Sequence, residues 1–251
     1  MNTIRISAVS YYNTLPLIYG ISQSGILKNY ELRLDVPSLC AVRLLNDEAD
    51  ISLVPVGALP SFHEYNLIGK HCIGAVGNVK TVLLLSNVPV NQLRKIYLDT
   101  DSRTSVVLVK VLAKRLWKVS VEWESLEGKD PLNLATDEGV VLIGDKTFGK
   151  PNKFNFCYDL AGCWHELTGL PFVFAAWIST RPLPAEFSQQ FEAALQWGVQ
   201  HKEQSISLAK NLVISEAELI HYLKYDISFE LDDAKKKGLE LFLSYLREDR
   251  Y

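Results

Sequence analysis

The sequence lacks the residue patterns that bind metals, form disulfide frameworks or supply a catalytic nucleophile. Its four cysteines show no metal-type pairing, and its five histidines form neither a His-Glu-x-x-His helix nor a cluster of ligands. No Ser-His-Asp order and no nucleophile-elbow glycine pattern is present. We therefore expect no metal and no cofactor, and we interpret the cysteines as small apolar core residues that stay reduced.

Excess charge and long apolar runs are also missing. The chain has 26 Lys and Arg against 29 Asp and Glu, and the formal net charge of −3 gives no attraction to nucleic acid or to an anionic membrane. No apolar run approaches the length that spans a membrane, and the first residues lead into a strand pattern without a signal-peptide core. We expect a soluble cytoplasmic protein whose partner is a small molecule.

With 251 residues, of which 48% are hydrophobic, the chain has room for one large core or two modest ones. Its first part alternates strand and helix patterns. Apolar residues alternate over 4–8, a helical pattern runs from Leu17 to Gly25, and a second strand covers 32–36. A helix capped by Ser38 and a buried strand over 49–56 follow. This β-α-β-α-β order is typical of a parallel α/β sheet with helices packed on it.

The α/β pattern then begins afresh at Lys95, which predicts a second lobe. We expect the chain to cross between the lobes near 86–91 and near 169–172, so that a cleft lies between them. The predicted lobes are residues 1–87 with 172–251 and residues 88–171. The C-terminal helical patterns, over 186–201, 205–212, 215–225 and 233–247, should pack on the first lobe.

Polar side chains gather where the first predicted strand turns into a helix, over Ser10 to Leu17. Open α/β sheets bind ligands at the carboxyl ends of their strands, so Ser10, Tyr11 and Asn13 are candidate binding residues. Thr14 is a candidate helix cap, and Ser38 should lie on the same edge of the sheet. Val56, at the end of the third predicted strand, is a further candidate. The alternative is a capped turn with solvated polar groups.

The segment Asp99 to Ser105 is the strongest candidate for an anion site. Hydroxyls and a guanidinium meet a helix start there, which suits a carboxylate or a phosphate. An ordinary helix cap with a solvated arginine is the alternative. The residues in question are Ser102, Arg103, Thr104 and Ser105.

Two further polar positions flank the predicted cleft. Thr81, beside a predicted lobe crossing, could add a hydroxyl, or it is a plain strand residue. Asp145, at a strand end, is either a ligand contact or a helix cap. The segment Gly144 to Lys150 nearly matches a phosphate-binding loop, but Pro151 stands where the magnesium-binding hydroxyl would be, so we do not predict nucleotide binding.

Several of these segments together resemble a known family over nearly the whole chain. The chain is similar to the chorismate dehydratases of the futalosine route to menaquinone, which have the fold of type II periplasmic solute-binding proteins. The segments that carry the resemblance are Val9–Leu17, Ala49–Gly57, Asp99–Ser105, Leu142–Asp145, Asp159–Leu160 with Trp164, and Leu167–Trp177.

The resemblance implies conversion of chorismate into 3-[(1-carboxyvinyl)oxy]benzoate and water. It places the active-site asparagine of the family on Asn13 and an active-site serine on Thr81, which keeps the hydroxyl. It also implies that the enolpyruvyl carboxylate of the substrate removes the C3 proton. Two alternatives stay open, namely a non-catalytic carboxylate binder and the sister enzyme 1,4-dihydroxy-6-naphthoate synthase, whose first motif differs. A homodimer through the apolar C-terminal helices is also left open.

Overall fold

A computed structural model describes residues 3–249 and divides them between two sheets. The first sheet has six strands in the order β11-β4-β10-β3-β1-β2. Strands β1, β2 and β3 are parallel, and β10 runs antiparallel to β3 and β4. The strands are β1 Ile4–Val9, β2 Tyr30–Asp35, β3 Ile51–Pro55, β4 Asn66–Ala75, β10 Phe172–Ser179 and β11 Ser228–Glu230.

The second sheet has five strands in the order β7-β6-β8-β5-β9. Strand β6 is parallel to β7 and β8, whereas β5 is antiparallel to β8 and β9. The strands are β5 Val82–Ser86, β6 Lys95–Leu98, β7 Glu122–Ser125, β8 Glu138–Ile143 and β9 Phe156–Asp159. The fresh α/β unit predicted from the sequence is therefore present.

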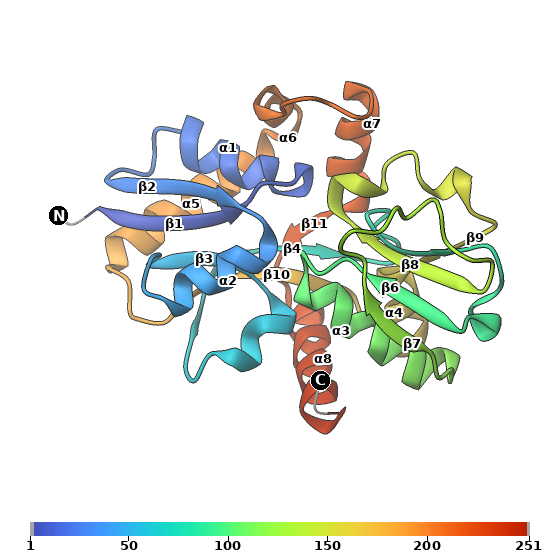
Figure 1. Ribbon diagram of the computed structural model, residues 1–251. Helices are drawn as coiled ribbons and strands as arrows, with labels where there is room; N and C mark the ends of the chain where they lie inside the picture. The colour runs from blue at the N-terminus through green and yellow to red at the C-terminus, as the bar shows by residue number, and fades with distance from the viewer. Residues whose placement is uncertain (1–2, 250–251) are drawn as a thin grey trace.

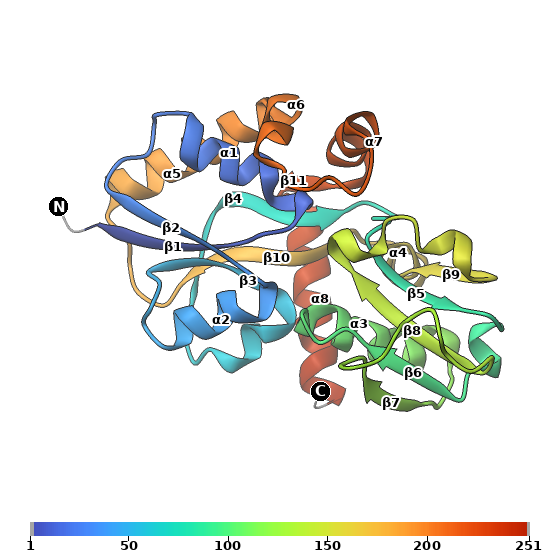
Figure 2. The ribbon, with the colours of Figure 1, turned by 45° about the horizontal axis from the view of Figure 1, so that its top comes forward.

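Helices cover both faces of the first sheet. Figure 2 shows α1 (Leu15–Gln23) and α5 (Ala185–Gln200) on one face and α2 (Pro37–Leu45) on the other. Helix α1 packs so closely on α5 that a Cβ at Gly20 would lie 2.0 Å from the Ala194 carbonyl oxygen. In the second lobe, α3 (Arg103–Leu112) and α4 (Leu160–Thr168) accompany the five-stranded sheet. Among the described residues no helix is both long and apolar enough to cross a membrane.

The last helix lies between the two sheets rather than on the first alone. Helix α8 (Asp233–Asp249) runs down the middle of the molecule in Figures 1 and 2. Its Phe242 packs edge to face on Trp164 of α4 and on Phe172 of β10, so it touches both lobes. Asp249 also pairs with Arg115, which follows α3. The expectation that these helices pack on the first lobe is therefore incomplete.

Several local predictions need correction. Strand β5 belongs to the second sheet, although the sequence assigned residues 82–86 to the first lobe. The predicted helix over 205–212 is only the short α6 (Lys202–Ser205) and a 3-10 turn over 206–208. Ser38 is the second residue of α2, whose start has no side-chain cap. The lobe bounds themselves stay a prediction, and residues 76–81 link β4 of the first sheet to β5 of the second.

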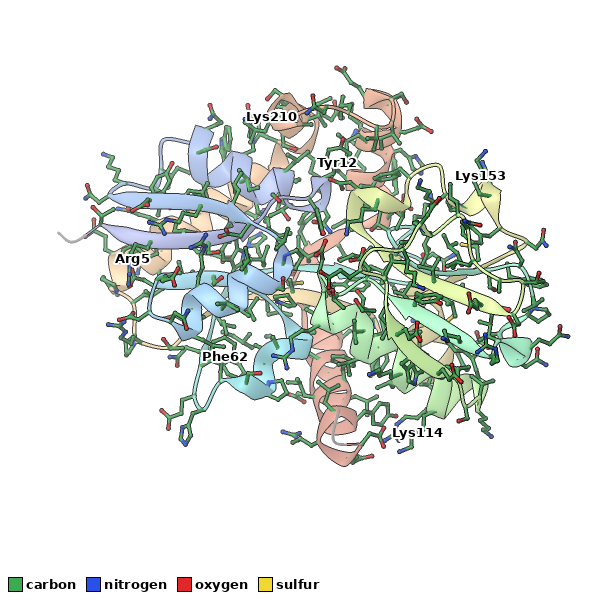
Figure 3. The ribbon with its side chains drawn as sticks, viewed as in Figure 1. Arg5, Tyr12, Phe62, Lys114, Lys153 and Lys210 are labelled. Carbon is green, nitrogen blue, oxygen red and sulfur yellow. The ribbon has the colours of Figure 1, made fainter. Side chains whose placement is uncertain are left out.

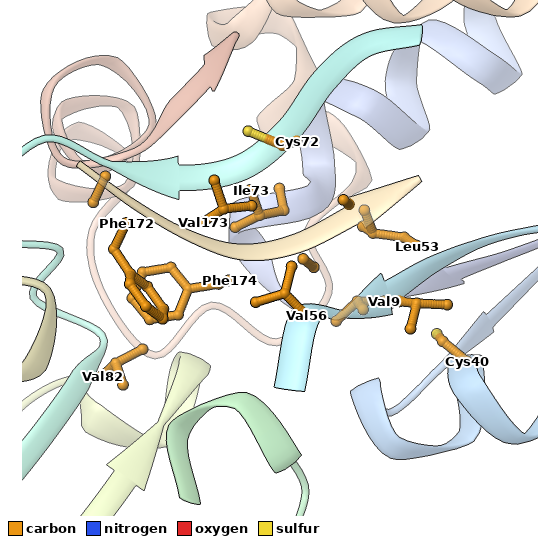
Figure 4. Close-up of a cluster of buried hydrophobic side chains, with 14 of the residues drawn as sticks. Val9, Cys40, Leu53, Val56, Cys72, Ile73, Val82, Phe172, Val173 and Phe174 are labelled. Carbon is orange, nitrogen blue, oxygen red and sulfur yellow. The ribbon is translucent and has the colours of Figure 1, made fainter. Parts of the chain in front are cut away.

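One hydrophobic core continues through the crossings from sheet to sheet. Figure 4 shows Val82, which begins β5, facing Phe172 and Phe174 of β10. Cys40 and Cys72 are fully buried in this core, as predicted. Cys157 is exposed, so the interpretation of all four cysteines as core residues is wrong for that one.

Candidate functional site

A small cavity of about 50 Å³ lies between the two sheets, where the turn after β1 faces the start of α3. Its described lining contains hydroxyl, phenol, amide and apolar groups, and no charged side chain. The lining residues are Val9, Tyr11, Asn13, Thr14, Pro37, Pro55, Ile73, Val79, Thr81, Val82, Ser102, Ser105, Ile143, Gly144, Phe174 and Ala175. Five of the residues singled out in the sequence as ligand contacts therefore meet here: Tyr11, Asn13, Thr81, Ser102 and Ser105.

The turn after β1 carries the first-lobe side of the cavity. Tyr12–Thr14 form one 3-10 turn that leads into α1, with Pro16 in the first turn of that helix. Asn13 is half-buried, and Thr14 donates a hydrogen bond to Asn13 Oδ1 at 3.0 Å rather than capping α1. Tyr12, labelled in Figure 3, does not line the cavity. Its hydroxyl contacts the backbone of Asn211 and Val213 instead.

The second-lobe side is the N-terminus of α3. Ser102 is the N-cap residue and its hydroxyl accepts from the backbone N–H of Ser105 at 3.4 Å. The Ser105 hydroxyl also donates to Ser102 Oγ at 3.3 Å, so the proton of Ser102 can point at a ligand. The Ser102 hydroxyl, at the positive end of a helix, suits a carboxylate without adding a charge to the cavity.

Thr81 stands at the crossing between the lobes, just before β5. Its side chain is 1% exposed, and its Oγ1 lies 2.7 Å from the hydroxyl of Tyr222. Tyr222 begins a π-helical turn, Tyr222–Asp226, that continues α7 (Glu216–His221). Tyr222 does not stand out in the sequence, because it continues a helix pattern with no unusual polar composition.

Asp145 joins the two lobes next to the cavity. Its carboxylate accepts the backbone N–H of Tyr12 at 3.1 Å, and burial raises the pKa of Asp145 to about 6. Its neighbour Gly144 has φ +59° and faces the Tyr11 ring, where a Cβ would lie 2.7 Å from a ring carbon. Asp145 therefore acts first as a contact between lobes, and Gly144 allows Tyr11 to close on the second lobe.

The remaining candidate residues lie outside the cavity lining. Ser10 is exposed, and Val56 is fully buried in the core. Ser38 contributes its backbone N–H to the Asp101 carbonyl at 3.1 Å, a contact between the lobes. Arg103 is exposed and donates to Ser61.

Thr104 is the fifth candidate residue that lies outside the cavity lining. Its hydroxyl is hydrogen-bonded to two backbone groups. Oγ1 donates to the Phe174 carbonyl and accepts from the Gly57 N–H, each at 3.0 Å. A hydroxyl with both of its strong interactions satisfied inside the protein has little left to offer a ligand. Thr104 therefore ties α3 to the first lobe.

A larger cavity of about 660 Å³ lies on the other side of Tyr222. Carboxylates dominate its charged lining, with Asp159, Glu166, Glu218 and Asp226 against Lys80. An acid with two negative charges would be repelled there, whereas the small cavity presents neutral donors and a helix N-terminus. Within residues 3–249 no group of His, Cys, Asp and Glu side chains is arranged to hold a metal ion.

Solved structures with similar folds define the class of protein. A protein from Archaeoglobus fulgidus matches with a TM-score of 0.74 at 14% identity, covering 98% of this chain and 97% of that one. The periplasmic aliphatic sulphonate binding protein of Escherichia coli matches with a TM-score of 0.65 at 13% identity, covering 100% and 88%. A Candida albicans protein described as having the generic periplasmic binding protein fold matches with a TM-score of 0.63 at 15% identity, covering 97% and 91%. The chain therefore has the two-lobed periplasmic-binding-protein fold, as predicted.

The sequence comparisons narrow this class to one family. The chain belongs to the menaquinone biosynthesis family, whose pattern it matches over residues 4–248. It is 28% identical to the chorismate dehydratase of Thermus thermophilus over 266 aligned positions, covering 94% of this chain and 92% of that protein. A shorter match, 39% identical over 74 positions, is to the chorismate dehydratase of Campylobacter jejuni and covers 25% of this chain and 32% of that protein.

Proposed function

We propose that this chain is a chorismate dehydratase, a lyase that converts chorismate into 3-[(1-carboxyvinyl)oxy]benzoate and water. The observation that carries the proposal is a cavity between the lobes whose described lining holds hydroxyls and an amide but no charged side chain. Chorismate needs no strong external base, since the loss of water makes its ring aromatic. The similarity to a chorismate dehydratase over nearly the full chain supports the same reaction.

The neutral lining suits a reaction that the substrate carries out on itself. The resemblance to chorismate dehydratases implies that the enolpyruvyl carboxylate of the substrate removes the C3 proton, and the described lining holds no carboxylate, histidine or lysine that would compete for it. The protein then has to hold one conformation and keep out water and competing rearrangements. We assign a substrate carboxylate to the Ser102 hydroxyl at the α3 N-terminus, which Ser105 orients, and the ring hydroxyl that leaves to Asn13 and Thr81.

The activity is tested by mixing purified protein with chorismate and following ultraviolet absorbance and product mass. Loss of one water, with formation of a benzene ring, supports the proposal. Binding with chorismate intact would instead favour a non-catalytic binder of the same fold. Indifference to chorismate, with turnover of a cyclised futalosine derivative, would favour the sister naphthoate synthase.

Asn13→Ala tests the assignment of the amide. We expect the fold to persist and turnover to fall by about 100-fold, the scale found when one preorganised donor is removed from an active site. The matched control is Asn91→Ala, an exposed asparagine in a turn of the second lobe, which should leave turnover unchanged. Equal turnover of Asn13→Ala and the unaltered chain would remove Asn13 from the mechanism.

Cytoplasmic location and a homodimer are further parts of this proposal. Location is supported by the biosynthetic family. The C-terminal helices offer little to a dimer, because α8 buries Leu239 and Phe242 within its own chain. Helix α2 exposes Leu39, Val42 and Leu45 instead, which is a better surface for a second copy. Light scattering measures the oligomeric state, and a mass near 28.3 kDa, that of one chain, would exclude the dimer.

A further inference from the structure

A buried phenol stands behind the proposed leaving-group site. Tyr222 is 3% exposed, and its hydroxyl lies 2.7 Å from Thr81 Oγ1, a partner 141 positions away in the chain. The tyrosine starts a π-helical turn, and such turns are frequent at functional sites. Burial raises the pKa of Tyr222 above its usual value, so the phenol keeps its proton at neutral pH and remains a donor.

The hydrogen bond between Tyr222 and Thr81 leaves one hydroxyl proton to spare. The two oxygens lie 2.7 Å apart, and either hydroxyl can donate to the other. The phenol is the more acidic of the two and therefore the better donor. With Tyr222 donating, Thr81 Oγ1 accepts, and the single proton of Thr81 is free to point into the cavity that Thr81 lines.

The backbone around Thr81 is fixed by neighbouring contacts. Lys80 has φ +66°, and its Nζ pairs at 3.1 Å with Asp226, the last residue of the same π-helical turn. Asp159 accepts the backbone N–H groups of Val79 and Lys80 at 2.9 and 2.6 Å. The first and last residues of this π-helical turn therefore both contact the segment: Tyr222 contacts Thr81, and Asp226 contacts Lys80.

We propose that Tyr222 is a positioning residue that orients the Thr81 hydroxyl as a hydrogen-bond donor to the oxygen leaving C4 of the substrate. This role rests on the proposed dehydratase function. As the C4–O bond breaks, charge builds on the departing oxygen, and a preorganised donor stabilises it. The C3–H bond also breaks, its electrons form the new ring double bond, and the C3 proton ends on the departing oxygen as water. Thr81 and Tyr222 keep their own protons.

The test is a double-mutant cycle measured with chorismate. Tyr222→Phe should lower kcat by about 10- to 100-fold with KM little changed, since the phenol orients a group that acts in the transition state. Thr81→Val should lose at least as much, and Thr81→Ser should retain most of the turnover. The double variant Tyr222→Phe/Thr81→Val should be no slower than Thr81→Val alone, because Tyr222 acts through Thr81.

Tyr225→Phe is the matched control, since Tyr225 lies in the same turn but is 73% exposed. It should leave kcat unchanged. Melting temperatures of all variants show whether a lower kcat reflects loss of fold. Multiplying losses in the double variant, or unchanged kcat in Tyr222→Phe, overturns the role of Tyr222 while the dehydratase function stands. An unaltered chain that leaves chorismate intact overturns the function itself and this role with it.

Discussion

The burial of Asp145 disfavours the ionised form of the carboxylate that joins the two lobes. Its carboxylate bridges the lobes by accepting the Tyr12 N–H, yet burial raises its pKa from the ordinary 3.8 to about 6. Between these two pH values the folded chain holds a proton that the unfolded chain has released. The free energy of unfolding therefore falls as pH rises through this window, and the cost is fully present above about pH 6.

Asp145→Asn should remove this cost and keep an acceptor for the Tyr12 N–H. We expect the variant to be more stable than the unaltered chain at pH 7, by at most about 3 kcal/mol and by less because the carboxylate is only partly buried. The advantage should shrink as pH falls from 6 and vanish below about 3.8. Urea unfolding at several pH values measures it, and an offset that does not change with pH would contradict the explanation.

At the scale of an element, α4 and the lobe crossing share one carboxylate. Asp159 ends β9 and caps α4 by accepting the N–H groups of Ala161 and Gly162 at 3.0 and 3.1 Å. The same carboxylate binds the N–H groups of Val79 and Lys80 in the crossing. One side chain thus fixes both the helix start and the segment that leads to Thr81, which couples the stability of α4 to the geometry of the site.

Asp159→Ala should cost more stability than the loss of an ordinary cap. We expect a decrease of about 2–4 kcal/mol in the free energy of unfolding, because four backbone N–H groups lose an ionised acceptor. Ser215→Ala is the control. It removes the exposed capping box of α7 and should cost about 1 kcal/mol. Chemical unfolding of both variants gives the comparison, and equal losses would mean that the contacts to the crossing contribute nothing.

At the scale of the whole molecule, the lobes lie nearly closed. A cavity of about 50 Å³ holds roughly three or four waters, which is too little space for a ring that carries two carboxylates. Contacts across the cleft include Tyr12 with Asp145 and Ser38 with Asp101. The proposed function therefore requires that the lobes move apart and these contacts break before chorismate enters.

A disulfide across the cleft tests this motion. The 3.1 Å hydrogen bond from Ser38 N to Asp101 O places these two backbones in contact across the cleft. We expect the variant Ser38→Cys/Asp101→Cys to lose turnover when oxidised and to regain it on reduction. The reduced form controls for both substitutions, and Ser38→Cys alone controls for oxidation of the native thiols. Full turnover by the oxidised variant would show that opening at this edge is not required.

The sequence by itself determined the parallel α/β units, because the period of apolar residues reports which face of each strand and helix is buried. It also brought Asn13, Ser102 and Ser105 together, and they line the small cavity, since residues that follow parallel strands gather at one edge of a sheet. The net charge of −3, by contrast, only argued against nucleic acid and anionic membranes as partners.

Only the tertiary structure decided which polar groups meet. Strand β5 is apolar on both faces, and periodicity cannot tell which of two sheets such a strand joins. The sequence favoured Thr104 as a ligand residue, but in the structure its hydroxyl is hydrogen-bonded to the backbones of Phe174 and Gly57. Tyr222 reaches Thr81 from a distant part of the chain. A contact between distant segments depends on how two lobes pack, and no local pattern of residues encodes that.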